Sequence, residues 1–160
     1  MCTCSHLMKE DINLSWENIH TIIFDFDGVF TDNKVYISEN GTESVKCDRG
    51  DGLALDMLRK FIILKDWDLD YLILTKETNP VVRKRAEKLK IKCFDSIDNK
   101  LEFIKKRLMD RFYEIENSRK GLIYLGNDLN DYDAMRFSGF SVSPNDANLK
   151  IKQISEFTLT

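Results

Sequence analysis

The stretch TIIFDFDG at residues 21–28 decides the fold of this chain. Residues 21–26 are mostly β-branched or aromatic, which predicts a strand buried within a sheet. Two carboxylates, Asp25 and Asp27, come two positions apart at the end of this strand, so their side chains begin on the same face. Gly28 then allows the backbone to turn tightly.

Further apolar runs follow along the chain and alternate with segments of helical periodicity. We expect strands at residues 69–75, 91–94, 121–125, 140–143 and 156–160, and helices at 52–64, 80–89, 101–115 and 129–137. An Asn-Gly pair at 40–41, between strand-like residues 35–38 and 42–47, predicts a hairpin. Because alternating strands and helices form right-handed βαβ units, the expected fold class is α/β with a mainly parallel sheet.

With 160 residues the chain has the size of one domain, which we place at residues 19–160, after a mobile N-terminal extension at 1–18. The 24 basic and 27 acidic residues give a net charge of -3, which argues against non-specific binding to nucleic acid.

Apolar runs reach only four residues, as at 61–64, and the first residues lack the apolar segment of a signal peptide, so we expect no membrane association. Four cysteines are too few for a disulfide framework, and we expect a cytoplasmic protein.

Polar side chains follow three of the expected strands. Asp25 and Asp27 end the first, Thr75 ends the strand at 69–75, and GNDLND at 126–131 follows the strand at 121–125. Because ligands bind beyond the carboxyl ends of an open parallel sheet, these groups are expected to share one crevice. Crowded carboxylates need a cation or protons, and hard oxygen ligands suit Mg²⁺. A carboxylate can also act as a nucleophile, and Lys100 is placed to neutralise phosphoryl oxygens, so these residues predict Mg²⁺-dependent phosphoryl chemistry.

The ordered set DFDGV at 25–29, Thr75, Lys100 and GNDLND at 126–131 resembles the four motifs of the haloacid dehalogenase (HAD) phosphotransferase superfamily. The likeness covers residues 20–160 and includes DNKVYISENG at 32–41, DRGDGL at 48–53, TKETNPVV at 75–82 and SPNDA at 143–147. Together these segments are similar to the capless branch that contains the phosphatases of 3-deoxy-D-manno-octulosonate (KDO) 8-phosphate and of N-acylneuraminate 9-phosphates. The resemblance implies a HAD-like Rossmannoid fold of three layers, with a β-hairpin flap and no separate cap domain.

The resemblance also implies a role for each matching residue. Asp25 would attack phosphorus, and Asp27 would protonate the leaving oxygen and then activate water. Thr75 would hydrogen-bond a phosphoryl oxygen, and Lys100 would pair with Asp25 and the phosphate. The implied Mg²⁺ ligands are Asp25, Asp27 through its carbonyl, Asn127, Asp128 and Asp131, and the implied substrate-binding residues are Thr75, Lys76, Arg49, Asp51 and Gly52. The implied substrate is an α-keto sugar-acid phosphate, a small molecule that is hydrolysed through an aspartyl-phosphate.

Two features depart from the family pattern. The fourth motif commonly begins Gly-Asp, whereas this chain has Asn127, whose amide oxygen can ligate Mg²⁺ but brings no charge. Relatives also continue into a Gly-rich, Arg-containing tail that closes over a neighbouring subunit's site, and this sequence ends at Thr160. By resemblance, the hairpin at 34–47 would pack between the subunits of a homotetramer.

Other interpretations of the same residues stay open. Thr75 could be an ordinary turn residue, Lys100 a solvated helix lysine, and Asp131 an exposed acid that the helix dipole favours. Arg49 and Asp51 could order the hairpin instead of touching substrate. A different function is that of a catalytically weak HAD-like domain for oligomerisation or regulation, similar to those fused to some sialic-acid cytidylyltransferases. A receiver-type signalling domain does not fit, because receivers carry the phosphorylated Asp on a middle strand.

Overall fold

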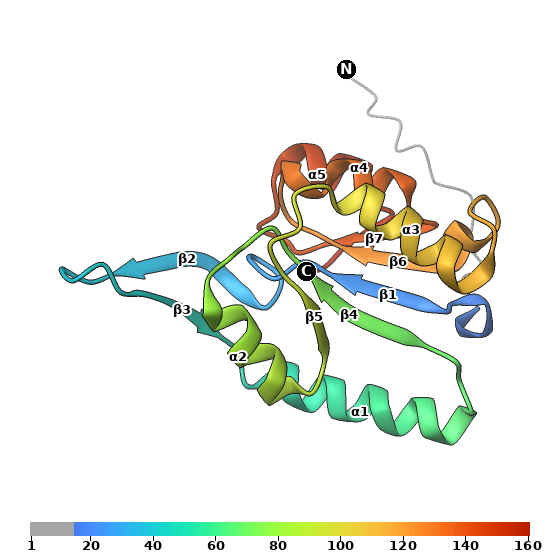
Figure 1. Ribbon diagram of the computed structural model, residues 1–160, viewed down its shortest axis with the longest axis horizontal. Coiled ribbons are helices and arrows are strands. Elements are labelled where there is room, and N and C mark those ends of the chain that lie inside the picture. The colour runs from blue at the N-terminus through green and yellow to red at the C-terminus, as the bar shows by residue number, and fades with distance from the viewer. Residues whose placement is uncertain (1–14) are drawn as a thin grey trace, which may run out of the picture.

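Six parallel strands form the central sheet, in the order β5-β4-β1-β6-β7-β8 (Figure 1). The strands are β1 (Thr21–Phe24), β4 (Asp70–Leu74), β5 (Lys92–Phe94), β6 (Leu122–Leu125), β7 (Phe140–Ser143) and β8 (Phe157–Thr158). A separate antiparallel hairpin consists of β2 (Thr31–Ile37) and β3 (Glu43–Cys47). The computed structural model describes residues 15–160, so most of the expected extension at 1–18 lies outside the described residues. The expected α/β class, the parallel sheet and the hairpin are confirmed.

Helices cover both faces of the sheet (Figure 1). On one side lie α1 (Gly50–Lys65) and α2 (Pro80–Leu89), and on the other lie α3 (Lys100–Phe112), α4 (Tyr132–Phe137) and α5 (Leu149–Ile154). Side chains alternate along each strand, so Leu72 and Leu74 pack toward α3 while Ile73 packs toward α1 and α2. Among residues 15–160, no helix has both the length and the hydropathy that crossing a membrane requires.

Local sequence signals explain where the helices begin and end. The Asn79 side chain accepts a hydrogen bond from the backbone N–H of Val81, and Pro80 occupies the first turn of α2. In the same way the Asn99 side chain accepts from the N–H of Glu102 and caps α3. The helix predicted at 101–115 is too long, because Tyr113 adopts a left-handed conformation with φ of 57° and ends α3 at Phe112.

The helix predicted at 129–137 is divided into two pieces. A 3-10 turn, η3 (Leu129–Asp131), comes first, and α4 begins only at Tyr132. The Asp131 carboxylate accepts the backbone N–H groups of Asn127 and Asp128, which holds this turn tightly against the end of β6. The remaining predicted strands and helices are confirmed with bounds that differ by up to four residues, whereas α5 was not predicted. Two further 3-10 turns, η1 (Trp16–Asn18) and η2 (Ser118–Gly121), had no sequence signal.

Gly139 is required where the turn before β7 passes the end of η2. A Cβ atom at this position would lie 2.2 Å from the backbone oxygen of Lys120. We expect Gly139→Ala to lower the free energy of unfolding by about 1–3 kcal/mol. The new Cβ would overlap the Lys120 backbone, which can move only at a cost to the packing of η2.

The matched control is Gly52→Ala on α1, where a Cβ would meet only the Leu89 side chain at 3.8 Å. That variant should be unchanged, or more stable by up to about 1 kcal/mol. Urea denaturation of both variants tests the comparison. Equal effects of the two substitutions would contradict the close approach at Gly139.

Candidate active site

One cavity of about 620 Å³ lies at the carboxyl ends of β4, β1 and β6. These three strands are neighbours in the sheet, so the segments that follow them meet at one edge. Six of the residues expected in the site line the cavity: Asp25, Asp27, Thr75, Lys76, Asn127 and Asp128. The expectation that the three strand ends share one crevice is therefore confirmed.

The centre of the site is an ion triad of two carboxylates around one ammonium. The Lys100 Nζ donates to Asp25 Oδ1 at 2.7 Å and to Asp131 Oδ1 at 2.7 Å. Lys100 is 4% exposed and Asp131 is 0% exposed, which excludes the alternatives of a solvated lysine and an exposed first-turn acid. Asp25 comes directly after β1, and Lys100 is the first residue of α3, so the start of this helix brings the cation to the strand end.

Burial shapes the protonation of this triad. Burial and the charge of Asp131 raise the pKa of Asp25 to about 7, although Lys100 opposes them. Burial alone would lower the pKa of Lys100, but the charges of Asp25 and Asp131 outweigh it and raise that pKa. Lys100 therefore stays an ammonium ion. With both acids ionised the triad carries one net negative charge, which favours a cation or a proton nearby.

Asp27 differs from Asp25 in being only half-buried at the cavity wall. Burial raises its pKa, and the charge of Glu77 raises it further, while Lys100 lowers it. A carboxyl group that holds its proton more strongly than usual, and that faces a cavity, is suited to act as an acid and then as a base. Asp25 and Asp27 therefore have environments that suit different roles.

Gly28 allows the turn that carries Asp27 to approach the fourth motif. Its φ is +74°, and a Cβ atom there would lie 1.9 Å from Nδ2 of Asn127. The Asn127 side chain is thus packed directly against this turn and is 5% exposed. Neither the conformation nor the contact permits a larger residue at position 28.

Thr75 and Lys76 follow β4 at the opposite wall of the cavity. The Thr75 Oγ1 accepts the backbone N–H of Glu77 at 3.0 Å, so Thr75 does serve as a turn residue. Its own hydroxyl hydrogen can still donate to a phosphoryl oxygen in the cavity. Lys76 pairs with Asp98 at 3.3 Å in an exposed position, where the pair is weakly held and the ammonium can reach a ligand.

The oxygen donors around the cavity fit Mg²⁺. Asp25, Asn127 and Asp128 line it, together with the turn that contains the Asp27 carbonyl. Among residues 15–160, no three His, Cys, Asp or Glu side chains cluster as a ready metal site. Mg²⁺ is usually held by one or two carboxylates together with water and substrate phosphate. Asp131 lies behind this set, since protein groups already occupy both of its oxygens.

Three residues expected to bind substrate lie away from this cavity, at the base of the hairpin. Arg49 immediately precedes α1 and is exposed, and Gly52 faces Leu89 of α2. Asp51 pairs with Arg85 at 3.0 Å, and Arg85 also donates to the backbone oxygen of Asp48. These contacts fit the alternative that this segment orders the hairpin, and contact of Arg49, Asp51 or Gly52 with substrate stays a prediction.

The sequence reasoning missed several residues of the site. Asn33, Glu77 and Asn130 also line the cavity. Asn33 has a φ of 57°, and an Asn in a hairpin segment is the only signal that could have placed it. Tyr124 was also missed, because its position on an apolar strand marks it as an ordinary core residue. Its hydroxyl donates to Asp131 Oδ1 at 2.8 Å.

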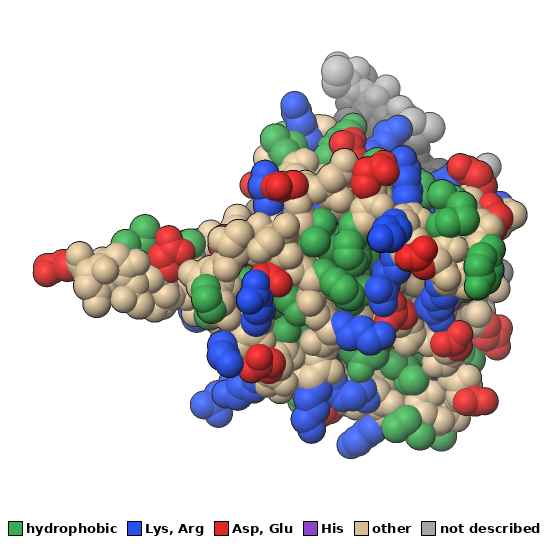
Figure 2. Space-filling model, in the orientation of Figure 1, with side chains coloured by type: hydrophobic (Ala, Val, Ile, Leu, Met, Phe, Trp, Pro, Cys, Tyr) green, Lys and Arg blue, Asp and Glu red, His purple; other side chains and the backbone are tan. Residues whose placement is uncertain are grey.

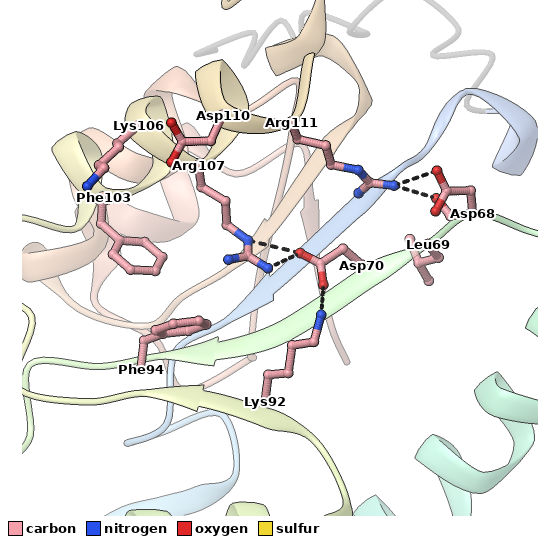
Figure 3. A pocket seen from close by; sticks show the side chains of 10 residues that line it. All are labelled: Asp68, Leu69, Asp70, Lys92, Phe94, Phe103, Lys106, Arg107, Asp110 and Arg111. Carbon is pink, nitrogen blue, oxygen red and sulfur yellow. Dashed lines mark hydrogen bonds and ion pairs between the residues drawn. The ribbon is translucent and has the colours of Figure 1, made fainter. Parts of the chain in front are cut away.

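A second cavity of about 620 Å³ lies between α3 and the strands β4 and β5 (Figure 3). Several of its charged side chains already pair with one another: Asp70 accepts from Lys92 at 2.8 Å and from Arg107 at 2.9 Å. Asp70 is the first residue of β4, so these pairs lie toward the amino ends of the strands, away from Asp25. We therefore place the active site in the cavity that contains Asp25.

Comparison with known proteins shows which solved structures this chain resembles. A structure described as a HAD family hydrolase from Streptomyces avermitilis is 34% identical to this chain. The alignment covers 92% of this chain and 79% of that chain, at a TM-score of 0.78. The KDO 8-phosphate phosphatase of Moraxella catarrhalis, solved with magnesium, phosphate and KDO, is 26% identical, with 91% of this chain and 78% of that chain covered, at a TM-score of 0.75.

Sequence comparison gives the same grouping. The KDO 8-phosphate phosphatase KdsC of Haemophilus influenzae is 29% identical over 144 residues, which span 90% of this chain and 75% of that protein. A more distant relative is an N-acylneuraminate cytidylyltransferase from Danio rerio, which is 25% identical over 135 residues. That alignment spans only 29% of the length of the cytidylyltransferase. No family model matches the chain. The 34% identity and the shared fold nevertheless show that this chain belongs to the HAD superfamily, in the family of HAD-type phosphatases that contains the KDO 8-phosphate phosphatases.

Proposed function

We propose that this chain is a Mg²⁺-dependent phosphomonoester hydrolase that acts on an α-keto sugar-acid phosphate, of the KDO 8-phosphate or N-acylneuraminate 9-phosphate type. The observation that carries the proposal is the buried Asp25, held 2.7 Å from Lys100 at the floor of a cavity that also presents Asp27 and Thr75. These are the groups that an aspartyl-phosphate route needs: a nucleophile, an acid-base residue and fixed donors for phosphoryl oxygens.

In the first half-reaction, an oxygen of the Asp25 carboxylate attacks phosphorus while the bond from phosphorus to the sugar oxygen breaks. Asp27 gives its proton to that leaving oxygen, and its raised pKa favours the protonated form that this step requires. Lys100 and the Thr75 hydroxyl donate to the phosphoryl oxygens, where negative charge is concentrated in the transition state.

In the second half-reaction, water attacks the phosphorus of the aspartyl-phosphate. Asp27, now a carboxylate, takes a proton from that water, and the bond between phosphorus and Asp25 breaks. The products are inorganic phosphate and the original Asp25 carboxylate. One residue thus acts as acid and then as base, so the protonation of Asp27 is restored after each turnover.

Mg²⁺, held by Asp25, the Asp27 carbonyl, Asn127 and Asp128, would neutralise phosphoryl charge and favour the ionised form of Asp25. Asp131 remains a predicted ligand, although its oxygens are directed to Lys100 and to backbone N–H groups. The cavity rim carries Lys76, whose ammonium suits the carboxylate of a sugar acid.

The hairpin supports the further proposal that the enzyme is a homotetramer. It extends from the edge of the sheet at which the parallel strands end, and Figure 2 shows it projecting from the body of the molecule. Three apolar side chains on β2 are exposed: Val35, Tyr36 and Ile37, the last at 70%. Because a two-stranded hairpin is only marginally stable alone, other copies of this chain are its best partners.

A second candidate function is that of a catalytically weak HAD-like domain for oligomerisation or regulation. Asn127 favours it, because the amide removes one negative charge from the proposed Mg²⁺ ligands. The likeness to part of a cytidylyltransferase is compatible with it as well. The intact set Asp25, Asp27, Thr75 and Lys100 favours the enzyme.

Phosphate release from KDO 8-phosphate, N-acetylneuraminate 9-phosphate and p-nitrophenyl phosphate tests the main proposal. We expect Mg²⁺-dependent turnover that EDTA abolishes and that is fastest with one of the sugar acids. Asp25→Asn should lower kcat by at least about a thousandfold, because no other group can form the acyl-phosphate.

Asp66→Asn is a matched control for this test. It makes the same chemical change at the exposed C-cap of α1, where Asn tolerates the φ of 49°. Its activity should equal that of the parent chain. Absence of turnover with all three substrates, in folded protein supplied with Mg²⁺, would favour the oligomerisation domain instead.

The role of Asn127 gives a separate prediction about the metal. Asn127→Asp adds a carboxylate to the proposed ligand set, so the Mg²⁺ concentration for half-maximal activity should fall several-fold. A titration of activity against free Mg²⁺ measures it. An unchanged Mg²⁺ requirement would show that residue 127 does not contact the metal.

The tetramer is tested by charging one face of the hairpin. We expect the parent chain to have the mass of four subunits by analytical ultracentrifugation, and Val35→Lys combined with Ile37→Lys to lower that mass by desolvating lysines in the interface. Leu149→Lys, at an exposed apolar residue of α5, is the control and should leave the mass unchanged. A monomeric parent chain, or a double variant of unchanged mass, would contradict the proposal.

A further inference from the structure

Among residues 15–160, Tyr124 is the largest side chain that is fully buried, and it lies in β6. Strand alternation turns it toward α3, into the core that contains Ile104 and Leu108. A buried phenol needs a hydrogen-bond partner, and Tyr124 has one: its hydroxyl donates to Asp131 Oδ1 at 2.8 Å. Burial and the nearby carboxylates raise its pKa well above the ordinary value, so the hydroxyl keeps its proton and acts as a donor.

Asp131 receives hydrogen bonds at both of its oxygens. Oδ1 accepts from Tyr124 at 2.8 Å and from Lys100 at 2.7 Å. Oδ2 accepts from the backbone N–H of Asn127 at 3.0 Å and from that of Asp128 at 3.4 Å. The backbone contacts hold one oxygen at the turn after β6, and Tyr124 sets the direction in which the other oxygen faces Lys100.

Lys100 is the link between this carboxylate and the reacting group. Its ammonium lies at the same distance, 2.7 Å, from Asp131 and from Asp25. Its position is therefore a balance between two competing anions. A donor that shares the charge on Asp131 Oδ1 weakens the attraction of that oxygen for Lys100 and leaves the ammonium free to face Asp25.

We infer that Tyr124 is a positioning residue of the active site, which acts through Asp131 and Lys100 to align the proposed nucleophile Asp25. The expected effect of Tyr124 on turnover rests on the proposed function, whereas the position of the Lys100 ammonium can be measured even in a chain without activity. Without the phenol, Oδ1 would have Lys100 as its sole donor among the groups described here, and the ammonium would shift toward Asp131.

Tyr124→Phe removes this one hydroxyl and keeps the ring. We expect kcat for the preferred sugar-acid phosphate to fall about tenfold, as for partners that orient catalytic ligands, while KM stays within about twofold. The division between kcat and KM separates positioning from binding, because the groups at the cavity rim are unaltered.

Tyr71→Phe is the matched control. Tyr71 lies on β4 in the opposite core, and its hydroxyl is a partner of Arg59, so the same chemical change is made away from Asp25. Its kcat should equal that of the parent chain. Thermal unfolding of both variants shows whether any loss of activity follows from lower stability alone.

A double-mutant comparison tests whether Tyr124 acts through Asp131. In an Asp131→Asn background, Tyr124→Phe should lower kcat by less than about twofold further, since the two residues share one pathway. A full tenfold loss in that background, or no loss in the single variant, would overturn the inference.

NMR of the Lys100 ammonium provides a readout that does not depend on activity. This buried, doubly paired group should give a slowly exchanging side-chain signal, and we expect that signal to shift in Tyr124→Phe and not in Tyr71→Phe. An unshifted signal in Tyr124→Phe would overturn the inference even if the parent chain releases no phosphate. A shifted signal without turnover would support the positioning geometry while the proposed function fails.

Discussion

The ammonium of Lys100 lies between two buried carboxylates, 2.7 Å from Asp25 and 2.7 Å from Asp131, and the rest of the site depends on this arrangement. Removing three charged groups from water is unfavourable unless each is paired and hydrogen-bonded. The structure meets that requirement by joining the end of β1, the first residue of α3 and the turn after β6. The loss of the Lys100 ammonium would leave both buried carboxylates without their cation.

The charge of the triad also explains why the site suits phosphoryl chemistry. Two acids and one base leave an excess of negative charge at the floor of a cavity whose wall holds Asp27. Burial raises the pKa of Asp25 to about 7, so its ionised form gains from a nearby cation. Asp27 is only half-buried, but its partial burial and the charge of the nearby Glu77 also raise its pKa. Because Asp25 and Asp27 are buried to different extents in one cavity, the two carboxylates of the DFD sequence are suited to different chemical roles.

Much of this could be predicted from the sequence, because strand ends in a parallel sheet have a known geometry. The positions of Asp25, Asp27, Thr75 and the segment 127–130 at one cavity follow from the strands that precede them. Arg49, Asp51 and Gly52 were expected near substrate by resemblance alone, and in this chain they lie at the base of the hairpin. That segment follows a strand of the hairpin and not one of the parallel sheet, so its place depends on contacts such as the pair between Asp51 and Arg85.

The sequence by itself determined the α/β class, the order of the motifs and the identity of the polar groups at the strand ends, because periodicity and turn residues act locally. Only the tertiary structure decided that Lys100 is buried between Asp25 and Asp131, and that Tyr124 donates to Asp131. A lysine at a helix start and a tyrosine within an apolar strand have no local feature that distinguishes them from surface and core residues. Their roles arise because β6 lies beside β1 in the sheet and α3 packs on the face to which Tyr124 points, which brings together groups up to 75 residues apart in the chain.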